Sequence, residues 1–421
     1  MSSGKLSQLA ETLIGSEIVS LGAEIKEKIK QGHKIYNYTV GDFDASVFPI
    51  PQELEKEIIE AYKNHHTTYP PADGIAELRE AVARFIAERE GLSYATNEIM
   101  IAAGGRPLIY AAFRAIVNRG DKVIYPVPSW NNNHYVHFTE GEHVLIESKL
   151  ENNFMPTAEQ IQPHLKGAAL LALCSPLNPT GTTFTKKELS AICDLVIAEN
   201  EQRGTGEKKL FLLYDQIYWT LTFGDTEHYN PVSINPKMKA YTIFIDGISK
   251  AFAATGVRVG WSMGPAELIN KMKAINSHVG AWAPMAEQKA VAAYMAQTQN
   301  INTYFHSFKA AIEERLRSIY NGFIQLKKEG FNVNAVAPQA AIYLTVQIDL
   351  AGKKTAGGDV LKTQADVTKY ILNEAKIAIV PFYAFGAGKD SSWYRLSVGT
   401  CKTEEINEML GKLKEALSKL D

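Results

Sequence analysis

The sequence predicts an α/β fold, with a mostly parallel seven-stranded sheet wrapped by helices and a smaller α+β unit beside it. From about Glu98 onward, short apolar runs alternate with helical stretches, which is the pattern of strands joined by helical crossovers. Strands are expected at 99–103, 122–125, 142–146, 168–173, 209–214, 241–245 and 258–262. The chain of 421 residues is long enough for two or three structural units with ample cores.

Composition and charge are those of an ordinary globular protein. Apolar residues make up 46% of the chain, charged residues 21%, and the formal net charge is −2, so neither a nucleic-acid patch nor an anionic-membrane surface is indicated. Cys174, Cys193 and Cys401 are too far apart for metal or redox spacing, which is typical of a reduced cytosolic protein. The sequence shows no apolar signal core and no apolar run long enough for a membrane helix. We therefore expect a cytoplasmic protein of enzyme size.

Before the alternating region, the chain mixes helices with turn-rich segments. Helices are expected at 5–31, 51–63 and 74–91, and a strand-like run at 34–41. The strand-like run ends at Gly41, and residues 42–51 are rich in turn residues. A stiff, proline-containing segment with Tyr69 joins the second and third helices.

Beyond Gly264 the chain is expected to be mainly helical, with one long stretch at 286–326. The tail, 331–417, combines helices with predicted strands at 341–348, 377–380 and 394–398. We therefore predict an N-terminal segment, 1–50, that belongs to the small domain, a large domain at 51–300 that carries the site, and a C-terminal small domain at 301–421.

A ligand site is expected among the residues that follow the strands, because ligands bind beyond the carboxyl ends of parallel strands. Gly104, Gly105 and Arg106 follow the first strand and begin a helix whose free amides favour an anion, phosphate above all. A tight turn without a ligand is an equally good interpretation. Trp130 offers a flat face for a planar ligand, although core packing is commoner, and Asn178 lies in a loop fixed by two prolines.

Further polar residues follow the later strands. Asp215 ends an apolar strand and needs a partner, either a helix cap or a cationic ring nitrogen. Lys250 follows Ser249 among apolar neighbours such as Phe252, where burial favours the nucleophilic free amine, although a lone lysine more often extends its charge to water. With the cation of Arg258, these residues supply an amine, a carboxylate, a stacking surface and a phosphate cradle. That set fits pyridoxal phosphate.

Four segments also match a known family in order and spacing: Ser175-Pro-Leu-Asn-Pro-Thr-Gly181, Asp215-Gln-Ile-Tyr218, Ser249-Lys-Ala-Phe-Ala-Ala-Thr-Gly-Val-Arg258 and Tyr394-Arg-Leu-Ser397. Looser matches are Gly41, Tyr69 with Gly74, Gly104 and Trp130. Over nearly its whole length, the chain therefore resembles the class I/II aminotransferases of the type I pyridoxal-phosphate fold, a family that includes bacterial aspartate aminotransferases.

The resemblance implies a role for each matched residue. Lys250 would hold pyridoxal phosphate covalently and then move the proton at the substrate Cα, while Asp215 would pair with the pyridinium nitrogen. Arg395 would clamp the substrate α-carboxylate, although without the resemblance an exposed strand arginine would be the simpler interpretation. The phenolic oxygen of the cofactor would be bonded by Asn178 and Tyr218, and its ring stacked by Trp130. The phosphate would be surrounded by Gly104, Gly105, Arg106 through its backbone, Ser249 and Arg258.

Further contacts implied by the resemblance concern the substrate and the subunits. Gly41, Trp130 and Asn178 would also lie against the substrate. Tyr69 would reach the phosphate of the neighbouring subunit, so a homodimer with shared active sites is implied. The sequence departs from the family at two places, the atypical segment 41–48 and Gly247, where many members have a phosphate-binding serine. These departures imply a differently shaped substrate pocket and one fewer hydrogen bond to the phosphate.

Arg106 gives the clue to the substrate. In some bacterial aspartate aminotransferases a lysine at the matching place meets the distal carboxylate of the substrate, so the resemblance implies transamination of aspartate or glutamate with an acceptor such as 2-oxoglutarate. A residue that only caps the helix start is an equally good interpretation of Arg106.

Other functions remain open from the sequence. The same cofactor chemistry occurs in lyases and in aminotransferases for aromatic or aliphatic amino acids, and the fold does not choose between them. A ligand-sensing regulator is disfavoured, because the family-like part begins almost at Met1 and no basic patch is evident. His65 and His66 have no further ligand nearby, so no metal site is expected, and His134 is better explained as a structural histidine.

Overall fold

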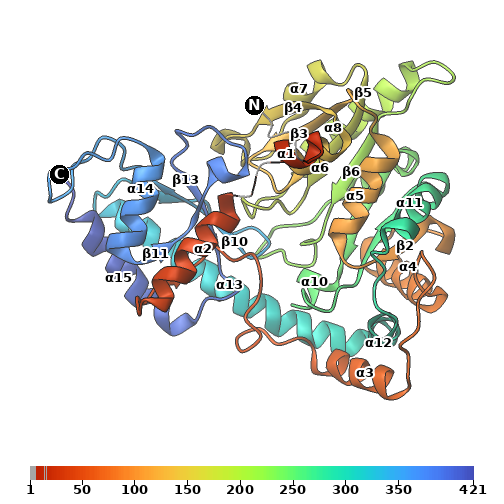
Figure 1. The fold of residues 1–421 in the computed structure, drawn as a ribbon, viewed down its shortest axis with the longest axis horizontal. Helices are drawn as coiled ribbons and strands as arrows, with labels where there is room; N and C mark the ends of the chain where they lie inside the picture. Colours follow the sequence, from red (N-terminus) through yellow and green to blue (C-terminus); the bar gives the residue numbers. More distant parts are fainter. Residues whose placement is uncertain (1–5, 14, 16) are drawn as a thin grey trace.

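Seven strands form the central sheet of the computed structural model, which describes residues 6–13, 15 and 17–421 (Figure 1). They are β2 (Ile99–Ala102), β3 (Lys122–Val127), β4 (Glu142–Glu147), β5 (Ala168–Cys174), β6 (Phe211–Asp215), β7 (Thr242–Gly247) and β8 (Gly260–Met263). Their order is β2-β8-β7-β6-β5-β3-β4, and only β8 runs antiparallel to its neighbours. The predicted fold class is confirmed.

Both faces of this sheet are covered by helices, so strand residues that point to either side are buried. Leu171 and Leu212 belong to the apolar core on one face, and Leu170 and Leu213 to the core on the other. The first face is covered by α3 (Gln52–Lys63), α4 (Ala76–Glu90), α8 (Lys186–Gln202) and α12 (Met285–Met295). The second face is covered by α5 (Gly105–Ile116), α6 (Asn132–Thr139) and α11 (Ala266–Val279).

A separate core joins the N-terminal segment to the C-terminal part. After the long helix α13 (Thr298–Lys328), an antiparallel sheet is ordered β12 (Val380–Pro381), β13 (Trp393–Ser397), β10 (Tyr343–Ile348) and β9 (Val333–Ala335). Near the other end of the chain, β1 (Tyr36–Asn37) pairs in parallel with β11 (Ile377–Ala378). The remaining main helices are α1 (Gln8–Thr12), α2 (Glu17–Lys30), α14 (Gln364–Tyr370) and α15 (Ile406–Leu417). The domain limits 1–50, 51–300 and 301–421 stay a prediction.

The structure corrects several predicted boundaries. The helix expected at 5–31 is two helices, α1 and α2, and residues 1–5, 14 and 16 lie outside the described residues. The run 34–41 pairs only at Tyr36 and Asn37. The helical stretch expected at 286–326 is interrupted between α12 and α13, because Gln297 has the non-helical angles φ −96° and ψ 59°. The last sheet strand begins at Gly260, since Arg258 has left-handed backbone with φ 64°.

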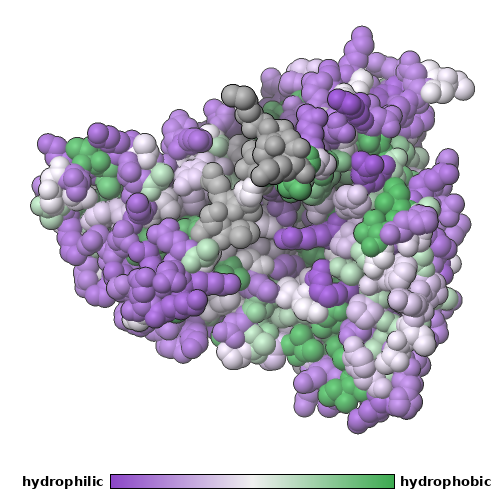
Figure 2. All heavy atoms as spheres, viewed as in Figure 1, coloured by the Kyte–Doolittle hydropathy of each residue, from purple (hydrophilic) through white to green (hydrophobic). Residues whose placement is uncertain are grey.

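The face of the molecule seen in Figure 2 is mainly hydrophilic, with apolar residues in small patches. None of the helices within the described ranges combines the length and the apolar character that a membrane crossing requires.

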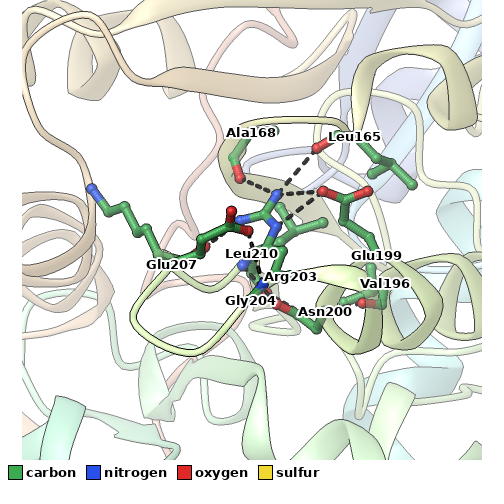
Figure 3. A network of polar contacts seen from close by, with 10 residues as sticks. Leu165, Ala168, Val196, Glu199, Asn200, Arg203, Gly204, Glu207 and Leu210 are labelled. Carbon is green, nitrogen blue, oxygen red and sulfur yellow. Dashed lines mark hydrogen bonds and ion pairs between the residues drawn. The ribbon is translucent and has the colours of Figure 1, made fainter.

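Arg203, which follows α8, connects this helix to the sheet (Figure 3). Its guanidinium donates hydrogen bonds to the Ala168 carbonyl oxygen (2.8 Å) and to the Glu199 carboxylate (2.9 Å), and its side chain is only 8% exposed. Nearby, the Asn200 side chain donates to the Leu210 carbonyl oxygen and accepts from the Leu210 amide, both at 2.9 Å. These bonds fix α8 against the starts of β5 and β6, whose carboxyl ends carry the site described below.

We predict that Arg203→Met destabilises the protein by about 2–4 kcal/mol, because it removes hydrogen bonds made by a buried charge and leaves Glu199 without its cation. Thermal unfolding followed at one fixed scan rate should show a Tm lower by several degrees. The control is Arg119→Met, which removes an ion pair to Glu140 from an arginine that is 83% exposed. Equal Tm changes in the two variants would contradict the stabilising role of the Arg203 network.

Candidate active site

A cavity of about 450 Å³ opens at the carboxyl ends of β5, β6 and β7. Most of the predicted site residues line it, although they come from distant parts of the chain. They are Gly41, Gly105, Arg106, Trp130, Asn178, Asp215, Tyr218, Ser249, Lys250, Arg258 and Arg395. Gly104 lies behind this wall and Tyr69 lies elsewhere, as described below.

Lys250 lies in the short helix α10 (Ile248–Ala251), directly after β7. Its Nζ donates a hydrogen bond to the Gly41 carbonyl oxygen at 2.6 Å and lies 5.5 Å from the centre of the Phe43 ring. Burial lowers the pKa of this amine to about 8, against the opposing effect of Asp42, and nearby arginines including Arg395 lower it further. At pH 7 about a tenth of Lys250 is therefore uncharged and nucleophilic, far more than for a lysine with the ordinary pKa of 10.5.

Asp215 ends β6 one strand away from Lys250. Burial raises the pKa of its carboxyl to about 6, and a hydrogen bond from the Ile217 amide at 3.1 Å opposes the rise. A half-buried carboxylate with so few donors is stabilised by a cation placed beside it. The position therefore suits a protonated ring nitrogen.

The start of α5 forms an anion cradle. Gly104 has φ +87°, and a Cβ at this position would lie 2.3 Å from a guanidinium nitrogen of Arg258. Arg258 itself donates to the Ala103 and Thr255 carbonyl oxygens at 2.8 and 2.5 Å. Helix amides, a close glycine backbone and a guanidinium together fit a phosphate group.

Gly247, the departure from the family noted above, has no room for a side chain. A Cβ there would lie 2.8 Å from the Cα of Gly260 and 2.9 Å from the Val259 carbonyl oxygen. The backbones of β7 and β8 therefore meet too closely at this point for a serine side chain.

Arg395 is 2% exposed and reaches the cavity from β13. It donates to Asn178 Oδ1 at 3.0 Å and to the Thr39 carbonyl oxygen at 2.6 Å, while its Nε has no partner among the described residues. Its guanidinium lies 4.7 Å from the centre of the Tyr343 ring and 4.9 Å from that of Phe385. A buried, incompletely satisfied guanidinium of this kind suits a carboxylate ligand.

Tyr343 was not predicted as a site residue, although it contacts two of the predicted ones. Its hydroxyl lies 2.5 Å from the Tyr218 hydroxyl, and its ring packs against Arg395. Because Thr345 is directly opposite Arg395 across β10 and β13, Tyr343 two residues earlier shares the face of Arg395. Alternation along β10 puts Tyr343 and Thr345 on one face, and this could be read from the sequence. The pairing of Thr345 with Arg395 could not, so the sequence offered no reason to place Tyr343 in the site.

Asp42 was predicted only as part of an atypical segment. The structure places it in the cavity wall, where its Oδ1 accepts hydrogen bonds from the Phe43 amide (2.8 Å) and the Thr255 hydroxyl (2.6 Å). Since Asp42 raises the pKa of Lys250, the segment after Gly41 influences the protonation of this amine.

Two predicted residues lie at the margins of the site. The Arg106 guanidinium lies 5.7 Å from the Trp130 ring centre, and no described residue offers it a hydrogen bond or an ion pair. Tyr69 is 85% exposed and packs edge-on against Trp282 at 5.3 Å, outside the cavity of its own chain. Within the described ranges no cluster of metal-ligating side chains occurs.

Comparison with known proteins gives one consistent result. The family described as Aminotransferase class I and II matches residues 34–413. An aspartate aminotransferase from Bacillus sp. (strain YM-2) is 30% identical over 419 residues, which is 99% of this chain and 98% of that protein. One from Geobacillus stearothermophilus is 30% identical over 386 residues, covering 91% and 92%.

Solved structures agree with this result. The aspartate aminotransferase from Rhizobium meliloti has a TM-score of 0.89 at 26% identity, covering 99% of this chain and 100% of that one. The Thermus thermophilus aspartate aminotransferase with maleate has a TM-score of 0.86 at 26% identity, covering 98% and 99%. The predicted resemblance is confirmed, and the chain belongs to the class I and II aminotransferases.

Proposed function

We propose that this aminotransferase uses pyridoxal phosphate to move the amino group of aspartate or glutamate to a 2-oxo acid such as 2-oxoglutarate. One observation carries the choice of substrate. Arg395 and Arg106 line the cavity that contains Lys250, and neither forms an ion pair with a carboxylate of the described chain. Two unpaired guanidinium groups suit a substrate with two carboxylates. The aspartate aminotransferase relatives and the maleate-containing Thermus thermophilus structure support this choice.

The residues of the cavity fit the cofactor. Asp215 would meet the pyridinium nitrogen, Trp130 the ring face, and Asn178 with Tyr218 the phenolic oxygen. The cradle at Gly104 and Gly105, with Ser249 and Arg258, would hold the phosphate. Bound pyridoxal phosphate supplies an aldehyde that reacts with amines and a ring that accepts electron density.

The residues of this chain would then perform the remaining work. Arg395 would bind the α-carboxylate and Arg106 the distal one, which fixes the substrate Cα relative to Lys250. The Lys250 amine, once free, would take the proton from Cα, and Tyr343 would hold Tyr218 and Arg395 in place. Proton removal at Cα suits an amine whose pKa is about 8.

We also propose that the active unit is a homodimer. Tyr69, exposed in the single chain, would reach the phosphate cradle of the partner, and the large domain (51–300) would face the small domain formed by 1–50 and 301–421 across the cleft. Both elements of this proposal follow from the family resemblance and the exposed position of Tyr69.

The first test is a spectroscopic half-reaction. When L-aspartate is added to the purified protein, absorbance between roughly 330 and 430 nm should shift completely to that of the aminated cofactor and return on addition of 2-oxoglutarate. Lys250→Ala should not show this reversible conversion, because it lacks the amine that moves the Cα proton. A cofactor band that ignores aspartate but responds to an aromatic amino acid would reject the acidic substrate and keep the cofactor.

Substrate choice is tested at Arg106. We expect Arg106→Ala to lower kcat/KM for aspartate, relative to an aromatic amino acid, by roughly ten- to a hundredfold, which is the size of a lost charge-assisted hydrogen bond. Arg119→Ala, at an exposed arginine outside the cavity, serves as the control. An unchanged ratio in Arg106→Ala would leave Arg106 with only a structural role at the helix start.

The pKa of Lys250 predicts a pH dependence in the cofactor-free protein. Only the unprotonated amine reacts with pyridoxal phosphate, so the reaction rate should rise with pH and level off above about 8. Asp42→Asn removes a carboxylate that raises this pKa, and the midpoint should therefore move to lower pH. Stopped-flow absorbance measures the rates, with Asp225→Asn as a control at an exposed site. A midpoint that stays or rises in Asp42→Asn would contradict the electrostatic role of Asp42.

A further inference from the structure

A second cavity, of about 750 Å³, lies outside the active-site cleft. Its walls come from the end of α4, from residues 219–233 after β6, and from one face of α13. None of its lining residues lines the cleft that contains Lys250. Its volume is within the range of sites for small organic ligands.

One stripe of α13 supplies a cation to this cavity. Asn302, His306, Lys309 and Glu313 follow one another at spacings of three and four residues and so share one helix face. Lys309 is half-buried, burial lowers its pKa, and no described residue gives it a hydrogen bond or ion pair. Glu313, the nearest carboxylate along the stripe, is bound to Arg317 at 2.6 Å.

Arg89, from the last turn of α4, supplies a second cation. Its guanidinium donates to Asn302 Oδ1 at 2.7 Å and lies about 5 Å from the ring centres of Phe85 (5.0 Å) and Phe305 (5.3 Å). Arg89 has no carboxylate partner within the described part of the chain. Glu88 and Glu313 lie near enough to raise the pKa of Arg89 and of Lys309, respectively, but neither cation forms an ion pair with a carboxylate of the described residues.

The floor of the cavity is polar but only partly charged. Glu90 is 3% exposed and accepts hydrogen bonds from Gln216 (2.7 Å) and Asn230 (3.3 Å), and burial raises its pKa to about 7. Beside it, Thr220 Oγ1 and His228 Nδ1 are buried without a hydrogen-bond partner among the described residues. Burial keeps His228 neutral by lowering its pKa to about 3.

We propose that this cavity binds a small phosphate monoester with a flat organic body. A phosphate monoester carries close to two negative charges at neutral pH, which two unpaired cations match. Arg89 and Lys309 would meet the phosphate, and the body would lie against Trp219 and Phe223, which also line the cavity. Arg89 and Lys309 would not have to break an existing ion pair to bind this ligand.

The test uses isothermal titration of the protein loaded with pyridoxal phosphate and then separated from the excess. The phosphate cradle of the active site is then filled, and no free cofactor, itself a phosphate monoester with a flat ring, competes for the second cavity. Phenyl phosphate is the probe, compared with inorganic phosphate and with phenol, which lacks the charge. We expect phenyl phosphate to bind more tightly than either. If inorganic phosphate bound as tightly, the proposed contact with an organic body would be wrong. If phenol bound as tightly, the proposed role of the two cations would be wrong.

Two variants locate the site. Lys309→Met removes the charge but keeps the length of the side chain, and Ala310→Phe fills the cavity from an exposed helix position without changing any charge. Each should weaken phenyl phosphate binding about tenfold or more. Lys328→Ala, at the exposed end of α13, should bind as the unaltered protein does. Unchanged affinity in both cavity variants, or a Kd for phenyl phosphate weaker than about 10 mM, would overturn the proposal.

Discussion

The structure depends on the removal of water from charged groups at one edge of a parallel sheet. Arg395 is buried there, Lys250 and Asp215 are half-buried, and desolvation shifts the pKa of each toward its uncharged form. Such groups are tolerated only where other polar groups complete their contacts. The sheet favours this arrangement, because the carboxyl ends of β5, β6 and β7 lie side by side at one edge, and Asn178, Asp215 and Lys250, which end or follow these strands, line one cavity.

Close packing of the backbone fixes the anion cradle, which is the start of α5 with Arg258, at this edge of the sheet. A Cβ on Gly260 would lie 2.7 Å from the Gly104 carbonyl carbon, and one on Gly247 would lie 2.8 Å from the Cα of Gly260. Three chain segments therefore meet at glycine contacts beneath the start of α5. Arg258 reaches over this layer and binds the Ala103 carbonyl oxygen. The packing between β7 and β8 therefore leaves no room for a serine side chain at Gly247.

Much of this architecture could be predicted from sequence, because strands buried on both faces are continuous apolar runs that stand out from polar loops. The same reasoning located Lys250 and Asp215, since each ends such a run. Sequence reasoning failed where the position of a residue depends on contacts with distant parts of the chain. The left-handed backbone of Arg258 accompanies side-chain bonds to Ala103 and Thr255 that the sequence does not reveal, and Tyr343 shares the face of Arg395 only through the register between β10 and β13. The break between α12 and α13 was hidden because the apolar pattern continues on both sides.

The turn after β6 connects the two cavities. Tyr218 lines the cleft of Lys250, whereas Trp219 lines the second cavity and donates from Nε1 to the buried Asp246 at 2.8 Å. Backbone hydrogen bonds from Trp219 to Gln216 and from Leu221 to Tyr218, both at 2.8 Å, make the turn rigid. Asp215 precedes it directly, so the carboxylate proposed for the cofactor ring and the floor of the second cavity belong to one stiff element. An occupant that displaced this turn would therefore displace Tyr218 as well, because Tyr218 directly precedes Trp219 and both residues belong to the hydrogen-bonded turn.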